Sequence, residues 1–206
     1  MDRSFAALSL PGRLILTLIL VLAWPVASHA TTVLRLPFQE VCDQAEFIFE
    51  GRVVDVAARV DAEGRYIWTH VVFEIAEAIK GSHSEDRIEL KFLGGTVGEL
   101  ALDVGEMHLP RVGDHGIYFV ESMRSPLAHP LVGWDQGHYR VEQTPDGGQR
   151  MMTANGKFIE SIVTQKRGGQ EFSAGIAYGV KISDPGLSAG AMPVTDFKVA
   201  VRRLAR

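Results

Sequence analysis

Histidine is the residue type in this sequence with the widest range of chemistry, and six of the seven histidines lie after residue 30. They are His70, His83, His108, His115, His129 and His138. No two are three to five residues apart, the spacing that places two metal ligands on one helix face. His108 and His115, together with Asp103 or Glu106, would form a metal site if the fold collected them, but exposed loop and strand histidines are the favoured interpretation. We therefore predict no metal and no cofactor.

The serine, glycine and cysteine residues give equally little support for nucleophilic catalysis. Ser122 and Ser125 share a loop with His129, but a catalytic triad needs a third group that orients the histidine. Residues 94–98 are glycine-rich, yet the Gly-Lys-Ser/Thr of a phosphate-binding loop does not follow. Cys42 is the one cysteine, and no base lies beside it in the sequence. We predict no catalytic residue and no enzyme. We expect Cys42 to be a small buried apolar residue, with an intermolecular disulfide or a reactive thiol as the alternatives.

The first thirty residues have the three parts of an export signal. Arg3 and Arg13 precede an apolar run at residues 14–23, and Ser28 and Ala30 are small residues at the positions that a signal peptidase reads. The run is about half of the ~20 residues that a membrane-spanning helix needs, so cleavage after Ala30 is favoured over an uncleaved anchor. We predict a secreted or periplasmic protein that begins at Thr31 and has no stable membrane insertion.

The overall composition restricts the class of protein further. Hydrophobic residues make up 46% and charged residues 22% of the 206-residue chain, which is typical of a globular domain. The formal net charge is −4, so a nucleic-acid partner is not expected.

Strand patterns dominate the chain after the signal. Residues 47–60 are rich in β-branched and aromatic types, and Gly51 within them indicates a bulge or bend. Residues 66–79 alternate, with Ile67, Thr69, Val71 and Phe73 on one face and Trp68 and His70 on the other. Further strands are expected at residues 87–92 and 115–121. A hairpin pairs residues 136–143 with residues 150–153 across an Asp-Gly turn.

The remaining residues complete a mainly-β architecture. Residues 156–194 are predicted to be loop-rich because glycines punctuate them. Residues 195–206 are predicted to hold a C-terminal helix, with Thr195 as its N-cap. Five or six strands without crossover helices favour a small antiparallel OB-type barrel over residues 31–155, with a β-hairpin extension. A β-sandwich is the alternative.

Two segments carry a resemblance to a known family. Residues 42–53 read Cys-Asp-Gln-Ala-Glu-Phe-Ile-Phe-Glu-Gly-Arg-Val, and residues 72–81 end in Lys80-Gly81. Both resemble the opening strands of netrin-like modules, the OB-type fold of the tissue inhibitors of metalloproteinases, and a similar layout occurs in exported bacterial proteins. The resemblance covers residues 40–125 and implies an OB-type (netrin-like) barrel.

The resemblance also sets the functional expectation. In the inhibitors the mature N-terminal cysteine chelates the zinc of the protease, whereas here Thr31 would come first and Cys42 lies further in. We therefore expect a non-catalytic protein-binding module whose partner is another exported or cell-surface protein. An inhibitor of an exported metalloprotease that acts without this chelation is the alternative.

One segment is a candidate recognition surface. Trp134, Asp135, Gln136 and Tyr139 surround a turn, and exposed aromatic residues often mark binding surfaces. The competing interpretation is that Trp134 closes one end of the barrel.

Overall fold

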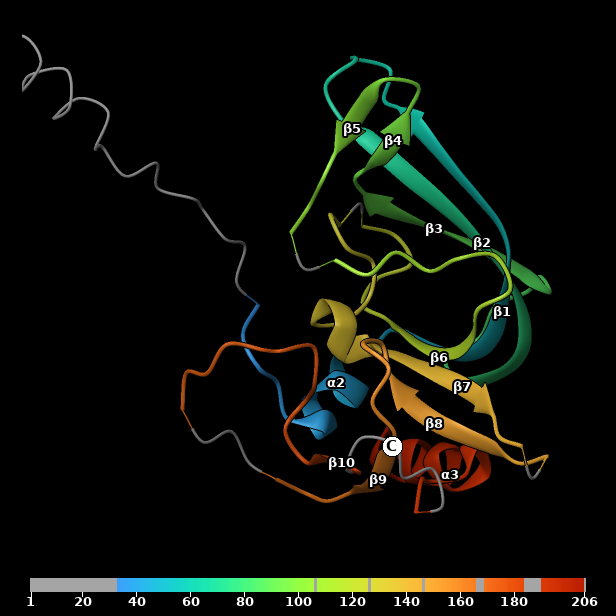
Figure 1. Cartoon of the computed structure of the whole chain (residues 1–206), viewed down its shortest axis with the longest axis vertical. Helices are drawn as coiled ribbons and strands as arrows, with labels where there is room; N and C mark the ends of the chain where they lie inside the picture. Colours follow the sequence, from blue (N-terminus) through green and yellow to red (C-terminus); the bar gives the residue numbers. More distant parts are fainter. Residues whose placement is uncertain are drawn as a thin grey trace, which may run out of the picture. The chain divides into compact units, whose positions relative to one another are not determined.

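Two long strands, β1 (Phe47–Val60) and β2 (Ile67–Lys80), form the principal ladder of the fold. We examined a computed structural model, which describes residues 33–105, 107–125, 127–145, 147–165, 169–183 and 190–205. The expected export signal at residues 1–30 and the expected first mature residue Thr31 lie outside these ranges. Both strands bend along their length (Figure 1).

The bend of β1 has a local cause at Gly51. The β1–β2 register shifts between Glu50 and Gly51, so the expected irregularity at this glycine is confirmed. A Cβ at Gly51 would lie 2.8 Å from the Glu74 carbonyl oxygen and 2.8 Å from a ring carbon of Phe49. Only glycine permits this close approach of the two strands.

Six antiparallel strands form the main sheet, in the order β3-β2-β1-β6-β7-β8. The other four strands are β3 (Arg87–Leu93), β6 (His115–Val120), β7 (His138–Gln143) and β8 (Gln149–Thr153). The predicted mainly-β class is therefore confirmed. The expected barrel closure is not found, because no ladder of described residues joins β3 to β8. Instead, isolated bridges to Phe158 and Pro193 cover the β8 edge.

The predicted hairpin is present and forms part of the main sheet. β7 and β8 pair from Tyr139 and Thr153 to Gln143 and Gln149, and β7 also pairs with β6. The hairpin therefore continues the sheet and is not an appendage.

Shorter elements fill the remaining chain. The expected loop-rich segment contains a two-stranded antiparallel ladder, and the C-terminal helix begins at Val194. Its N-cap is Pro193 without a side-chain hydrogen bond, so the predicted Thr195 cap is wrong. These elements are α2 (Phe38–Gln44), β4 (Gly95–Val97), β5 (Leu100–Leu102), η1 (Trp134–Gly137), β9 (Ile159–Ile162), β10 (Val180–Ile182) and α3 (Val194–Leu204).

Two hydrophobic clusters pack against the main sheet. Ile48 belongs to the cluster that contains residues of α2 and α3, whereas its neighbours Phe47 and Phe49 belong to a second cluster with Phe73 and Tyr118. Successive residues of a strand point to opposite faces, so β1 supplies both clusters. Within the described ranges, no helix has the length and apolar character needed to cross a membrane.

Candidate functional site

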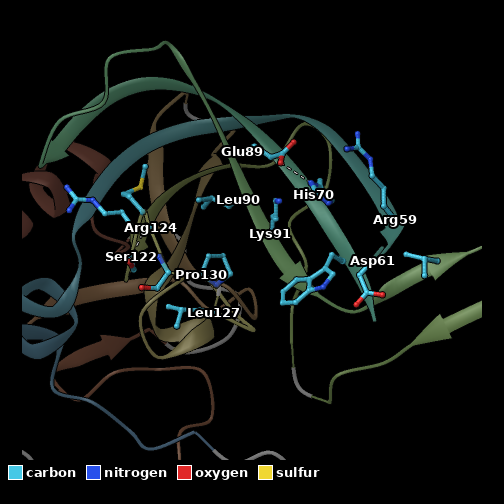
Figure 2. A pocket seen from close by; sticks show the side chains of 14 residues that line it. Arg59, Asp61, His70, Glu89, Leu90, Lys91, Ser122, Arg124, Leu127 and Pro130 are labelled. Atoms are coloured by element: carbon cyan, nitrogen blue, oxygen red, sulfur yellow. Dashed lines mark hydrogen bonds and ion pairs between the residues drawn. The ribbon is translucent and has the colours of Figure 1, made fainter. Parts of the chain in front are cut away.

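A hollow of about 600 Å³ runs beside the edge strand β3, and we call it the β3 trough (Figure 2). It lies between the β1–β2–β3 part of the sheet and the loop that follows β6. Its lining residues are Arg59, Val60, Asp61, Trp68, His70, Glu89, Leu90, Lys91, Ser122, Met123, Arg124, Ser125, Leu127 and Pro130.

Strand alternation places the polar side of the trough. Ile67, Thr69 and Val71 of β2 are buried, so Trp68 and His70 lie on the opposite face of the strand. The ladder sets Trp68 against Arg59 of β1 and His70 against Lys91 of β3. This outer face was predicted from the alternation of β2, and the structure confirms it.

The free edge of β3 supplies unpaired backbone groups. The Leu93 amide points away from β2, because it donates to the Ala128 carbonyl at 2.8 Å. Outward backbone groups recur at every second residue of an antiparallel strand, so those of Lys91 and Glu89 share this direction. No other described segment hydrogen-bonds to them. The β3 trough therefore runs along an edge that is able to accept another strand.

The charges of the trough divide into paired acids and unpaired bases. Glu89 accepts a hydrogen bond from His70 Nδ1 at 2.9 Å, an interaction that Figure 2 marks. Asp61 accepts from the backbone amides of Arg65 and Tyr66 at 2.7 and 3.1 Å, respectively. The three cations of the trough, Arg59, Lys91 and Arg124, are exposed and have no ion-pair partner among the described residues. Hydrogen bonds do not cancel the charges of Asp61 and Glu89, but the three cations outnumber these two carboxylates, so the formal charge of the trough is positive.

The opposite wall is a short loop held by side-chain hydrogen bonds. Ser122 Oγ accepts from the amides of Arg124 and Ser125 at 3.2 and 3.1 Å, respectively. The Met123 amide donates to Glu46 Oε2 at 2.9 Å. These bonds engage Ser122 Oγ with the backbone, and Leu127 and the buried Pro130 also line this side of the trough (Figure 2). The wall therefore combines the apolar side chains of Leu127 and Pro130 with the cation Arg124.

The predicted recognition residues lie elsewhere, and their side chains differ in exposure. Tyr139 is 1% exposed and contacts the rings of Phe38, Phe119 and Phe197. Gln136 is fully buried: its side chain accepts from the amide of Leu36 at 2.8 Å. These two residues therefore stabilise the interior and do not form an exposed recognition surface.

The other two predicted residues line a separate hollow of about 360 Å³. Trp134 is half-buried, has a positive φ of 60°, and stacks on His129 with ring centroids 5.4 Å apart. The buried Asp135 carboxylate accepts a hydrogen bond from His108 Nδ1 at 2.5 Å. Partner binding through Trp134 and Asp135 stays a prediction.

The geometry offers little for catalysis or metal binding. Among the described residues, no group of three His, Cys, Asp or Glu side chains is placed to hold a metal ion. Cys42 is free and buried within α2, as predicted, and burial raises the pKa of its thiol to about 12. The thiol is therefore protonated and shielded at neutral pH.

One sequence pattern typical of hydrolases falls near the C-terminal helix. Residues 186–190 read Gly-Leu-Ser-Ala-Gly, the spacing of a nucleophile elbow. Residues 184–189 lie outside the described part of the chain. The described flanks differ from such an elbow: β10 is a three-residue antiparallel strand, and α3 begins at Val194, six residues after Ser188. A nucleophile elbow requires the helix to follow the serine directly on a sharp turn.

Comparisons with protein-family models, with curated proteins and with solved structures return no match to this chain. The resemblance of residues 40–125 to netrin-like modules therefore stays a prediction.

Proposed function

We propose that this chain is a non-catalytic protein-binding module, exported from the cell, that takes an extended segment of another exported or cell-surface protein as an additional strand on β3. The open backbone edge at Glu89 and Lys91 is the single observation that carries the proposal. Strand addition is a general mode of peptide recognition, in which backbone hydrogen bonds supply affinity and side-chain pockets supply specificity.

The chemistry of the trough selects the occupant. An added strand would direct alternate side chains toward the apolar wall at Leu127 and Pro130. Its remaining side chains would lie beside Lys91 on the outer face of β3, and the charge of Lys91 has no ion-pair partner in the described chain. The preferred segment is therefore extended, with apolar residues alternating with acidic ones.

Protease inhibition is the alternative form of the same activity. The surroundings of Cys42 argue against inhibition by cysteine chelation, because its backbone nitrogen is a peptide nitrogen within α2 and its carbonyl accepts from Lys80 Nζ at 2.8 Å. A metalloprotease partner would have to engage another surface, and the β3 edge is available for this. The proposed export has its own measurement: mass spectrometry of the secreted protein should show Thr31 as the first residue. A membrane-bound protein that retains residues 14–23 would contradict the proposed localisation.

A synthetic peptide tests the binding mode directly. The probe is an end-blocked heptapeptide of alternating glutamate and valine, compared with its lysine–valine counterpart by titration calorimetry. We expect the acidic peptide to bind more tightly, because exposed charge pairs contribute about 0.2–1 kcal/mol each. On binding, hydrogen exchange at the amides of Glu89 and Lys91 should slow. N-methylation of alternate peptide bonds should abolish binding because it removes the donors.

Two variants of Lys91 provide the matched control. Lys91→Pro removes an outward amide without removing a bond to β2, whereas Lys91→Thr removes the charge and keeps the amide. Strand addition predicts loss of binding in the proline variant and a loss of about fivefold or less in the threonine variant. Equal affinities of the two folded variants, or no binding of either peptide at millimolar concentration, would contradict the proposal.

A further inference from the structure

A second hollow opens on the face of β7 that carries His138, and we call it the β7 cleft. It has a volume of about 660 Å³ and lies between β7 and the segment that precedes β6. This volume is within the range of small-molecule sites, and such sites combine apolar walls with a few polar groups. The lining residues are Val56, Met107, His108, Leu109, Pro110, Arg111, Val112, Asp114, His138, Arg140 and Ala154.

Unsatisfied buried polar atoms lie at the inner side of the cleft. His138 is 4% exposed and Tyr118 is fully buried, and their rings stack with centroids 4.9 Å apart. Neither ring nitrogen of His138 nor the hydroxyl of Tyr118 has a hydrogen-bond partner among the described residues. Leaving buried polar groups unpaired destabilises the folded state. His138 lines the cleft, and a hydrogen-bonding ligand that displaces the atoms covering its ring nitrogens would recover this free energy.

The strand register brings a cation to the same place. Arg140 lies two residues after His138 on β7, so both side chains are on one face of the sheet. The residue opposite Arg140 on β6 is Gly116, where a Cβ would lie 3.2 Å from the Tyr118 hydroxyl, so the Tyr118 ring packs against this position. Neither Arg140 nor the exposed Arg111 has an ion-pair partner in the described chain.

The other charged groups of the cleft already have partners. Asp114 accepts a hydrogen bond from the Arg111 amide at 2.8 Å. His108 is held by Asp135 through Nδ1 at 2.5 Å. Burial, followed by the charges of Arg140 and His108, lowers the pKa of His138 to about 3, so its imidazole is neutral at pH 7 and has one donor nitrogen. Asp114 keeps its negative charge, but the guanidinium groups of Arg111 and Arg140 outnumber it, so the formal charge of the lining is positive.

The walls away from these groups are apolar. Met107 and Leu109 are half-buried and pack against the second hydrophobic cluster, and Val112 is 64% exposed at the rim. A fully hydrated inorganic anion would leave this surface in water. An anion with an apolar body would bury this surface, which favours binding.

We propose that the β7 cleft binds a small amphipathic carboxylate. The carboxylate pairs with Arg140 and Arg111 and accepts a hydrogen bond from His138, and the apolar body packs against Met107, Leu109 and Val112. Guanidinium groups match the planar geometry of a carboxylate, which favours this anion over a rounder one. This site is separate from the β3 trough, and its occupant is a small molecule, not a protein segment.

Three probes of one chain length test the charge requirement. Decanoate, decanol and decylamine are titrated into the full protein at pH 7, below their micellar concentrations, and binding is followed by the amide chemical shifts of β7. We expect decanoate to bind at least tenfold more tightly than decanol and decylamine not to bind. Equal binding of all three probes would show nonspecific apolar partitioning and overturn the proposal.

Two cationic positions, Arg140 and Lys181, provide the matched variants. Arg140→Gln should weaken decanoate binding at least tenfold and leave decanol binding unchanged. Lys181→Gln removes an exposed cation from β10, outside the cleft, and should change neither. Unchanged decanoate affinity in folded Arg140→Gln would overturn the assignment. The alternating glutamate–valine peptide should still bind this variant at β3, so failure of one site is distinguishable from failure of the other.

Discussion

Cys42 illustrates how a residue without chemical activity can still be identified from sequence. Its lack of a partner cysteine indicated a buried apolar role, and the structure places it fully buried in α2. Cys42→Ser should lower the free energy of unfolding by about 1–3 kcal/mol, because a buried hydroxyl without a hydrogen-bond partner replaces a weakly polar thiol. Cys42→Ala, which adds no polar group, should cost less. Denaturant unfolding measures both variants.

Thiol labelling provides an independent check on the same residue. Native Cys42 should react slowly and accelerate in denaturant, because burial keeps the thiol protonated and shielded. Fast labelling of the native protein, or a dimer on non-reducing gels that disappears with reductant, would contradict the buried assignment.

Gln136 shows where reasoning from single residues reaches its limit. A glutamine in a polar turn beside Trp134 is typical of a surface, yet the structure buries it. Its side-chain oxygen accepts from the Leu36 amide, and its nitrogen donates to the Leu34 carbonyl at 3.0 Å. These partners are about a hundred residues away in the chain, so no local pattern indicates them.

At the scale of elements, α3 is fixed to the sheet by charge as well as by apolar packing. Lys198 Nζ donates to Glu50 of β1 at 2.7 Å and to Glu77 of β2 at 2.8 Å. Glu50 is 7% exposed and also accepts from His115 at 2.9 Å. The His115 hydrogen bond and then Lys198 lower the pKa of Glu50 to about 2, against the opposing effect of burial.

Removing this lysine tests the attachment of the helix. Lys198→Met should cost about 1–3 kcal/mol in the free energy of unfolding, less than the ~3–5 kcal/mol typical of a fully buried pair, because His115 remains as a partner of Glu50. The pKa of Glu50, followed by NMR titration, should rise. Arg203→Met changes an exposed cation on the same helix and should stay within about 0.5 kcal/mol. A similar loss in both variants would contradict a specific role for the ion pairs.

Element length decided which parts of the fold could be predicted. β1 and β2 each have 14 residues, so their composition and alternation were evident in the sequence. α2 has 7 residues and no side-chain cap, and it was missed. β10 has 3 residues and pairs with β9 across a glycine-rich segment, so the local pattern indicated a loop.

At the scale of the whole molecule, strand order was the missing information. The alternation of residues 87–92 indicates a half-buried strand, but it does not say which edge of that strand is free. That edge is defined by the order β3-β2-β1-β6-β7-β8, which depends on contacts distant in the chain. The polar side of the β3 trough at Trp68 and His70 was therefore predictable, whereas the edge itself and the cation Arg124 were not.

Two buried histidines make the stability of the whole molecule depend on pH. His129 and His138 are each 4% exposed, and burial is the main cause that lowers the pKa of both to about 3. His138 further lowers the pKa of His129, whereas Arg140 and His108 act on His138. An unfolded histidine has a pKa near 6.5.

The direction of the effect follows from proton binding. Between about pH 6.5 and pH 3 the unfolded chain binds more protons at these histidines than the folded chain, so acid favours unfolding. Above about pH 6.5 both histidines are neutral in the folded and in the unfolded chain, so they add no pH dependence to the free energy of unfolding. As the pH falls below this value, each histidine lowers the free energy of unfolding by up to about 1.4 kcal/mol per pH unit. The loss from two histidines is a large fraction of a typical free energy of unfolding of about 5–15 kcal/mol. Glu50 lowers the free energy of unfolding further below about pH 4.5, the pKa of this carboxyl in the unfolded chain.

Denaturant unfolding from pH 8 to pH 4 measures this slope. We expect a nearly constant free energy of unfolding above pH 7 and a steep decrease below pH 6.5. His129→Gln removes one titrating group and should reduce the slope by about half between pH 6.5 and pH 5, whatever its effect on stability at pH 8. His83→Gln, in the loop before β3, is the matched control: it makes the same substitution and keeps both His129 and His138, so the steep decrease should persist. A flat profile in the unmodified protein would show that His129 and His138 are accessible to protons in the folded state.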